Sequence, residues 1–272
     1  ANSLGSSANS LIYTTTGGNS PQLALNEVAK RIQSGDIDCS LIAGGEALDT
    51  FVKRIKLGMS TDWSDDPGGE PEIIGSAQDG ANDHEKIYGL FNPSSVYPLF
   101  ANALRAKDGT SPAKHMLEVG ELFSEFSKVA SENEHAWFPI HRTAEEISEV
   151  KPENRIIGFP YTKYMNSIMR VNQSSALVMV SAKKAREMGI PESKWVFMHA
   201  GACLNEIFHM SDRVDYHSSP AIKSCTDAVF NLSNTTQEEM DFLVRNEKRN
   251  KYIKNLVTGL HGNTLCLFQY VE

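Results

Sequence analysis

The chain has 272 residues, of which 40% are hydrophobic and 22% charged, and its formal net charge at pH 7 is −8. This composition is that of a soluble globular protein and excludes whole-chain disorder, collagen-like repeats and coiled coils. The negative charge disfavours nucleic acid as a partner, and the longest apolar runs are too short to span a bilayer. The four cysteines form no C-x-x-C pair, so we expect neither a zinc ribbon nor a dense disulfide framework.

The first 50 residues are typical of one strand–helix–strand unit. β-branched and aromatic residues over 11–16 predict a strand, and an apolar stripe over 21–33 predicts a helix. Ser20 is positioned to cap this helix and Pro21 to begin it. A second strand is expected over 38–43. Because a helix joins the two strands, we predict parallel pairing through a right-handed crossover.

The pattern changes after residue 50 and returns near residue 173. Helices are predicted over 96–106 and 113–131, separated by loops rich in proline and glycine. Further on, the sequence predicts strands over 176–180 and 195–200, with a helix over 182–188 between them. A helix over 221–230 and a last strand over 265–271 complete the expected elements. Residues 51–160 are therefore interpreted as a helical insertion between two pieces of one sheet.

Several segments, in chain order, resemble thiolases. They are TTGGNSPQ at 15–22, LIAGGEA at 41–47, VNQSSALV at 171–178, HAG at 199–201 and SSPA at 218–221. The match covers roughly residues 10–235. The branch that it resembles most is the thiolase-like acetyl-CoA acetyltransferase group, which is related to the sterol-carrier-protein thiolases.

This resemblance implies a layered α/β fold with mostly parallel sheets and an inserted helical loop domain. We expect four parts. Residues 1–50 begin the amino-terminal half, 51–160 form the loop domain, 161–192 return to the first half, and 193–272 hold a partial carboxy-terminal half with a divergent tail. The strand–helix unit that the family places before residue 10 is missing, so we expect an incomplete, truncated version of the fold.

The resemblance also implies binding of acyl-CoA and carbon–carbon bond chemistry of the acetyl-CoA acetyltransferase type. Thiolases use a cysteine at a helix start as acyl carrier, because the helix dipole favours its thiolate. Aligning Gln22 places that position at or next to Gly17, and no cysteine lies between Ala1 and Asp38. We therefore expect a CoA thioester as ligand or substrate, no covalently bound cofactor and no cysteine-based thiolase catalysis.

Two sets of residues are candidates for the chemistry itself. Gly17, Gly18 and Asn19 form a strand-to-helix turn that could present backbone N–H donors to a thioester oxygen. The alternative is a tight turn that needs glycine dihedral angles. His261 and Cys266 are the late histidine–cysteine pair that could serve as base and nucleophile, with a purely structural role as the alternative.

A third set could bind the CoA moiety. In the family, the segment that returns from the loop domain borders the acyl-CoA channel, which points to Lys163, Tyr164 and Asn166 here. Lys163 could meet a phosphate as a point charge, and the alternative is a solvated loop. No set of histidines, cysteines and carboxylates has the spacing of a metal site, so none is expected.

Two other functions stay open at this stage. The chain could be a non-catalytic structural subunit of a larger assembly, or an acyl-CoA carbon–carbon lyase that needs a partner and uses Tyr161 or Tyr164 for the proton. The resemblance implies a homo- or hetero-oligomer. We expect an intracellular protein, in the cytoplasm, the mitochondrion or the peroxisome.

Overall fold

The computed structural model describes residues 8–63 and 70–233, and all structural statements concern these residues. The strands are β1 (Ile12–Thr14), β2 (Cys39–Ala47), β3 (Glu72–Ile74), β4 (Ile156–Gly158), β5 (Tyr161–Thr162) and β6 (Asn172–Val180). The helices are α1 (Ser20–Ser34), α2 (Leu48–Lys56), α3 (Asp83–Ile87), α4 (Pro93–Lys107), α5 (Pro112–Ser131), α6 (Ala144–Ser148), α7 (Ala182–Glu187) and α8 (Pro220–Ser233). Short 3₁₀ turns are η2 (Lys163–Met165), η3 (Glu192–Lys194) and η4 (Met210–Asp212). None of the described helices is long and apolar enough to cross a membrane.

Helix α1 forms where the apolar stripe predicted it. Pro21 lies in its first turn, and Gly35 ends it with a left-handed φ of 82°, donating its N–H to the carbonyl oxygens of Arg31 and Ile32. The predicted capping by Ser20 is wrong. Its hydroxyl instead donates a hydrogen bond of 2.6 Å back to the carbonyl oxygen of Thr15, which ties the helix to the end of β1.

The predicted parallel pairing of the first two strands is also wrong. Strand β1 pairs in parallel with β3, whereas β2 pairs with β6 in the antiparallel sense, and β4 with β5 likewise. The described residues thus form three two-stranded sheets, of which only one is parallel. The crossover rule applies only to two strands of the same sheet. Here β1 and β2 belong to different sheets, because β1 pairs with β3 and β2 with β6.

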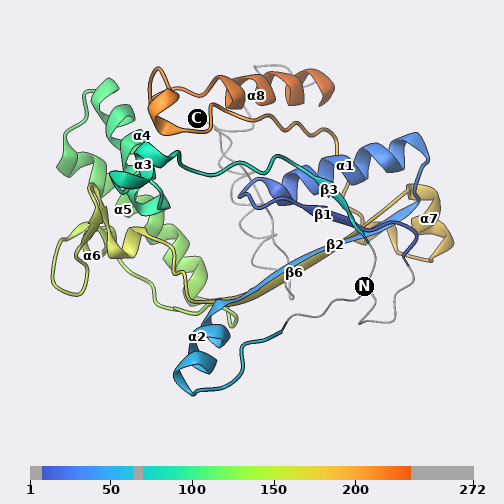
Figure 1. Ribbon diagram of the computed structural model, residues 1–272, viewed down its shortest axis with the longest axis horizontal. Coiled ribbons are helices and arrows are strands. Elements are labelled where there is room, and N and C mark those ends of the chain that lie inside the picture. Colours follow the sequence, from blue (N-terminus) through green and yellow to red (C-terminus); the bar gives the residue numbers. More distant parts are fainter. Residues whose placement is uncertain (1–7, 64–69, 234–272) are drawn as a thin grey trace.

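The β2–β6 ribbon is the longest sheet of the structure. Its register runs without a shift from the pair Cys39–Val180 to the pair Ala47–Asn172. Helix α1 lies along one face of the ribbon, where Ile42 is partly buried (Figure 1). On the opposite face Leu41 remains 63% exposed.

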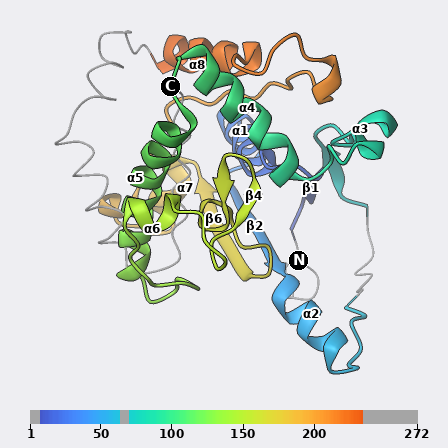
Figure 2. The same cartoon turned by 90° about the vertical axis from the view of Figure 1, so that its left-hand side faces the viewer.

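The region between β2 and β6 carries most of the helices, as the sequence predicted. Both long helices form close to their predicted ranges, as α4 and α5. They lie on one side of the molecule with α6 and the β4–β5 hairpin (Figure 2). At Gly120 the helices α5 and α6 approach so closely that an added Cβ would lie 2.6 Å from the carbonyl oxygen of Ala144.

The predicted strand over 195–200 does not form. This segment has no regular secondary structure, and the side chain of Val196 is 97% exposed. An apolar run becomes a strand only when another strand takes up its backbone hydrogen bonds, and the described residues offer none here. The predicted strand over 265–271 lies outside the described residues.

The close contact of α5 with α6 at Gly120 leads to a prediction for stability. Replacing Gly120 by valine should destabilise the fold by about 1–3 kcal/mol, because the branched side chain would press on the backbone carbonyl oxygen of Ala144. Urea unfolding followed by circular dichroism measures this change. Glu121→Val at the exposed neighbouring position is the matched control, with an expected loss below about 1 kcal/mol. Equal losses in the two variants would contradict the close α5–α6 contact.

Candidate functional site

The turn between β1 and α1 offers free backbone donors. It lies at the end of α1 that faces the inserted helices (Figure 1). The carbonyl oxygen of Gly17 accepts the N–H of Ser20 at 3.1 Å, whereas the N–H groups of Gly18 and Asn19 find no acceptor among the described residues. Neither glycine has a left-handed φ, and an added Cβ at Gly18 would meet open space. Glycine dihedral angles therefore do not explain this turn, and its two donors stand free at a helix N-terminus.

A thiol stands beside this turn, although it comes from a distant part of the chain. The side-chain amide of Asn19 lies 3.5 Å from the Sγ of Cys203. The segment that carries Cys203 runs close along α1, because an added Cβ at Gly201 would collide with the side chain of Asn26. This thiol is not among the site residues predicted from the sequence. No local pattern marks it, since only the approach of Gly201 and Cys203 to α1 brings it to the turn.

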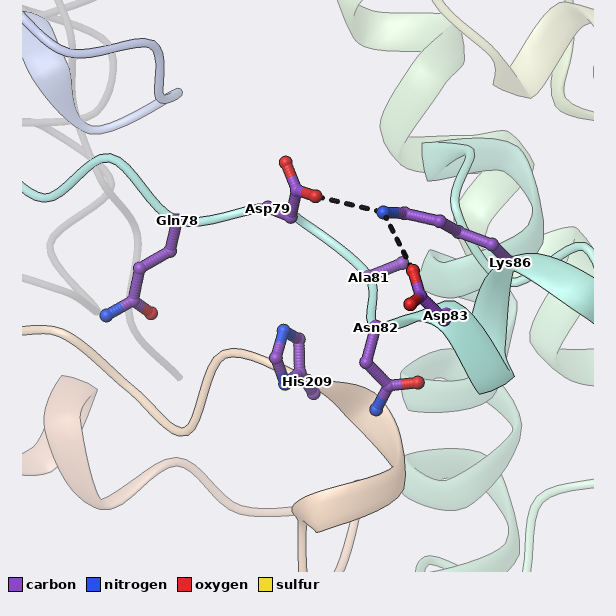
Figure 3. Close-up of a pocket in the computed structure, with 7 residues that line it drawn as sticks. All are labelled: Gln78, Asp79, Ala81, Asn82, Asp83, Lys86 and His209. Carbon is purple, nitrogen blue, oxygen red and sulfur yellow. Dashed lines mark hydrogen bonds and ion pairs between the residues drawn. The ribbon is translucent and has the colours of Figure 1, made fainter.

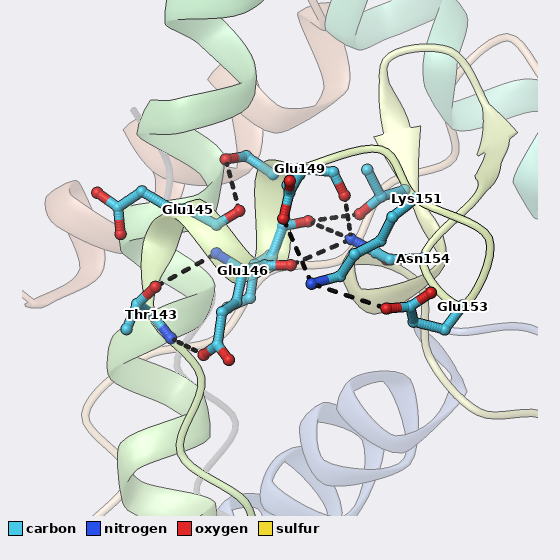
Figure 4. Close-up of polar contacts among 10 residues, drawn as sticks. Thr143, Glu145, Glu146, Glu149, Lys151, Glu153 and Asn154 are labelled. Carbon is cyan, nitrogen blue, oxygen red and sulfur yellow. Dashed lines mark hydrogen bonds and ion pairs between the residues drawn. The ribbon is translucent and has the colours of Figure 1, made fainter.

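The return segment before β6 is fixed by two buried polar side chains, Asn154 and Thr162, each 0% exposed. The amide of Asn154 donates to the carbonyl oxygens of Glu149 (Figure 4) and Ile147 at 2.9 Å each. Its Oδ1 accepts the N–H of Tyr164 at 2.9 Å. The hydroxyl of Thr162 donates to Ile147 at 2.7 Å. Because buried polar groups are costly to leave unpaired, these bonds hold η2 in one position relative to α6.

The three residues predicted to bind CoA lie on or next to η2. The ring of Tyr164 carries the guanidinium of Arg142 over its face, at 4.1 Å from the ring centroid. Lys163 is exposed, and neither its ammonium nor the guanidinium of Arg142 has an ion-pair partner among the described residues. Asn166 is used differently, because its amide donates to the carbonyl oxygen of Thr162 at 2.7 Å. One cation without an ion-pair partner among the described residues thus stacks on the Tyr164 ring, and a second, Lys163, is its neighbour in the sequence.

Arg142 is held in place by its backbone as well as by the stack on Tyr164. Its carbonyl oxygen accepts hydrogen bonds from the hydroxyls of Ser124 and Ser127 on α5, at 2.7 Å and 3.2 Å. Its N–H donates to Ser127 at 2.9 Å. No sequence motif marks this arginine, because its neighbours lie on α5 and η2. A guanidinium stacked on a ring but free of carboxylates keeps its donor fork available to a ligand.

A second polar cluster lies where α3 meets η4, beside a hollow of about 410 Å³ (Figure 3). Lys86 pairs with Asp79 at 2.9 Å, and this hydrogen bond holds the pKa of the Asp79 carboxyl below its ordinary value. Glu85 is 1% exposed and accepts the N–H groups of Ser211 and Asn82 at 2.6 Å and 2.9 Å. Burial alone would raise the pKa of Glu85, but these backbone donors outweigh it and hold the pKa below the ordinary range.

The structure does not bring the sequence-predicted residues into one site. No contact among the described residues joins the turn of Gly17, Gly18 and Asn19 to the set of Lys163, Tyr164 and Asn166. His261 and Cys266 lie outside the described residues. Within residues 8–63 and 70–233, no group of three histidines, cysteines or carboxylates could hold a metal ion.

Comparison with solved structures gives an informative match. No protein-family model and no curated protein matches the chain. Among solved structures, the crystal structure of a monomeric SCP2-thiolase-like protein type 1 from Mycobacterium smegmatis is similar, with a TM-score of 0.63 and 31% identity. The match covers 82% of this chain. The fold is thiolase-like. The chain spans only 41% of the length of that thiolase-like relative, so the relative's other parts have no counterpart in the match.

The buried carboxylate that joins α3 to η4 leads to a prediction for stability. Glu85→Gln should lower the free energy of unfolding at pH 7 by about 1–3 kcal/mol, because an amide cannot accept from both N–H groups as a carboxylate does. Because the pKa of Glu85 is lowered in the folded protein, its carboxylate stabilises the fold at pH values above the unfolded pKa near 4.5. This contribution to the free energy of unfolding is lost as the pH falls through the folded pKa. The difference between wild type and variant should thus shrink in acid.

Urea unfolding at pH 7 and at lower pH values measures both effects. The control is Glu118→Gln, which removes a carboxylate from an exposed pair on α5 and should change stability by less than about 0.5 kcal/mol. A difference between wild type and Glu85→Gln that grows in acid would contradict the assigned direction of the pKa.

Proposed function

We propose that the chain is a thiolase-like acyl-CoA-binding protein that does not carry out cysteine-based thiolysis. The observation that carries this proposal is the stack of Arg142 on Tyr164, which hydrogen bonds hold in place beside the exposed Lys163 in a thiolase-like fold. The CoA thioester is the ligand of this proposal, and acetyl-CoA acetyltransferase chemistry is the activity of the family that the chain resembles.

The chemistry of CoA suits this arrangement. Its nucleotide end carries phosphates and a flat adenine ring. The free fork of Arg142 can take a phosphate with two parallel hydrogen bonds, and Lys163 adds a mobile positive charge. Because Arg142 rests on Tyr164 rather than on a carboxylate, a phosphate would not have to displace an existing ion pair.

The thioester end of the ligand would use the β1–α1 turn. The free N–H groups of Gly18 and Asn19 at the start of α1 are suited to a polarised carbonyl oxygen. Binding at this turn requires no nucleophile, and the turn itself carries none. Cys203 is the thiol nearest to it among the described residues; its Sγ lies 3.5 Å from the side-chain amide of Asn19, the N-cap of α1, but it belongs to a distant segment of the chain.

The two alternative functions receive different support. A non-catalytic structural role is favoured by the apolar face of the β2–β6 ribbon, on which Leu41 and Val178 are exposed. The lyase is not favoured by Tyr161, because burial raises the pKa of its phenol above the ordinary value and makes it a poorer base. Such a phenol could donate a proton but not begin the reaction as a base.

Calorimetric titration with acetyl-CoA tests the binding site. We expect saturable binding that Arg142→Ala weakens at least about tenfold and Lys163→Ala somewhat less, because hydrogen bonds to charged groups contribute about 1.5–3 kcal/mol. Acetylpantetheine, which lacks the nucleotide, should bind more weakly and with the same affinity to wild type and Arg142→Ala. Lys194→Ala removes an exposed lysine from another part of the surface and is the matched control. Equal affinities of Arg142→Ala and Lys194→Ala for acetyl-CoA would refute the assigned phosphate contacts.

The catalytic part of the proposal is tested by thiolysis of acetoacetyl-CoA with free CoA. Neither the wild type nor Cys203→Ser should form acetyl-CoA above the uncatalysed rate, because neither the β1–α1 turn nor the first turn of α1 contains a cysteine. The absorbance of the Mg²⁺-complexed enolate of acetoacetyl-CoA at alkaline pH follows the consumption of this substrate. Turnover by the wild type that is lost in Cys203→Ser would overturn the proposal and identify Cys203 as an acyl carrier.

A further inference from the structure

The segment of residues 195–205 has backbone groups without hydrogen-bond partners, and it is here called the unpaired segment. It lies between η3 and η4 and belongs to no helix or strand. Among the described residues, no backbone N–H or carbonyl oxygen of residues 196–205 takes part in a hydrogen bond. A row of free donors and acceptors along consecutive residues is a template on which another strand can add.

The unpaired segment runs in an extended form along α1. The Sγ of Cys203 lies 3.5 Å from the side-chain amide of Asn19, whereas an added Cβ at Gly201 would collide with the side chain of Asn26. Seven residues of an α-helix rise about 10 Å, and two residues come close to that distance only when they are extended. The backbone therefore already has the conformation that strand pairing requires.

The unpaired segment is apolar on both of its sides and nothing in it blocks pairing. The neighbouring side chains of Val196 and Phe197 are 97% and 66% exposed. Strands whose successive residues are apolar are those that a sheet buries on both faces. Free edge strands are usually protected by lysine, proline or another charged residue. The unpaired segment contains no proline, lysine, arginine or carboxylate, so it is suited to accept a strand.

The chain itself carries a segment that matches this edge. Residues 265–271 have the sequence LCLFQYV, which predicts a strand, and they too contain no proline and no charged residue. In a chain with a net charge of −8, two uncharged segments can meet without like-charge repulsion.

The position of α8 allows these residues to reach the edge. Helix α8, which ends at Ser233, lies on the same side of α1 as the unpaired segment (Figures 1 and 2). Residues 234–264 follow it in the sequence and can span up to about 100 Å when extended. The length of the connection therefore does not prevent the two segments from meeting.

We propose that residues 265–271 add as a strand to the unpaired segment of the same chain. The backbone groups of the two segments then pair with each other, and the apolar side chains on each are shielded from water. The added strand also restrains Cys203, because that residue belongs to the unpaired segment and contacts Asn19 at the β1–α1 turn. This inference is independent of the proposed acyl-CoA binding.

Hydrogen–deuterium exchange of the full chain, followed by mass spectrometry, tests the pairing. The amides of residues 196–205 should exchange at least about tenfold more slowly than those of a free peptide of the same sequence, although no described residue accepts from them. Proline removes an N–H donor, and alternate N–H groups of a strand point to the same neighbour. At least one of Leu267→Pro and Phe268→Pro should therefore restore fast exchange. Asn250→Pro, outside the predicted strand, is the matched control and should keep the exchange slow.

Cysteine cross-linking identifies the segment that adds. In a chain whose cysteines other than Cys266 are replaced by serine, single cysteines are placed in turn at positions 196–200 and oxidised. Side chains alternate along a strand, so Cys266 should form a disulfide only with positions two residues apart and not with the positions between them. Leu122→Cys, at an exposed position on α5, is the control and should form none.

The possible outcomes separate this pairing from other ways of covering the edge. Fast exchange of residues 196–205 in the wild type overturns the proposal. Slow exchange that neither proline variant changes also overturns it, because another part of the chain then covers the edge. Slow exchange that appears only at high protein concentration means that a second copy supplies the strand, and this too overturns the proposal. Cross-linking keeps the proline background out of the test, so unfolding of a proline variant cannot be mistaken for loss of pairing.

Discussion

The antiparallel hydrogen bonding of β2 with β6 is the constraint on which the rest of the structure depends. It joins segments that are more than 120 residues apart and fixes nine consecutive residue pairs in one register. A shift by one residue would turn every side chain to the other face, moving Ile42 away from α1 and Leu41 toward it. The position of α1 over the ribbon, and therefore the position of its free N-terminal donors, follows from this register.

The polar core between α6 and η2 has a comparable effect on the second candidate site. The described part of the chain buries few large apolar side chains, and among its fully buried groups are Asn154, Thr162 and Glu85. Hydrogen bonds with fixed geometry, rather than apolar packing alone, thus orient the segment that carries Lys163 and Tyr164. A cationic site gains from this rigidity, because less conformational entropy is lost when a ligand binds.

Local structure could be predicted from the sequence, but pairing could not. The apolar periodicity of α1, α4 and α5 is a property of neighbouring residues, so these helices were found with nearly correct ends. The partners of β1 and β2 depend on distant segments, and the apolar run around Val196 looks like a strand although no strand accompanies it. The same distinction between local and distant contacts applies to the candidate site residues. The turn at Gly17 to Asn19 was visible as a motif, whereas the approach of Cys203 to Asn19 and of Arg142 to Tyr164 arises only from packing.

The pairing of Ala47 with Asn172 has a consequence for how this molecule can diversify. The chain leaves the ribbon at Ala47 and re-enters it at Asn172, and hydrogen bonds between Thr50 and Asn172 fasten the two points together. The segment from α2 to η2 is therefore an insertion whose two ends lie next to each other on the β2–β6 ribbon. Such an insertion can become longer or shorter, or be replaced by another, without changing the distance between its two ends. The segment that carries Lys163 and Tyr164 can thus vary in sequence without a change in the β2–β6 ribbon that supports it.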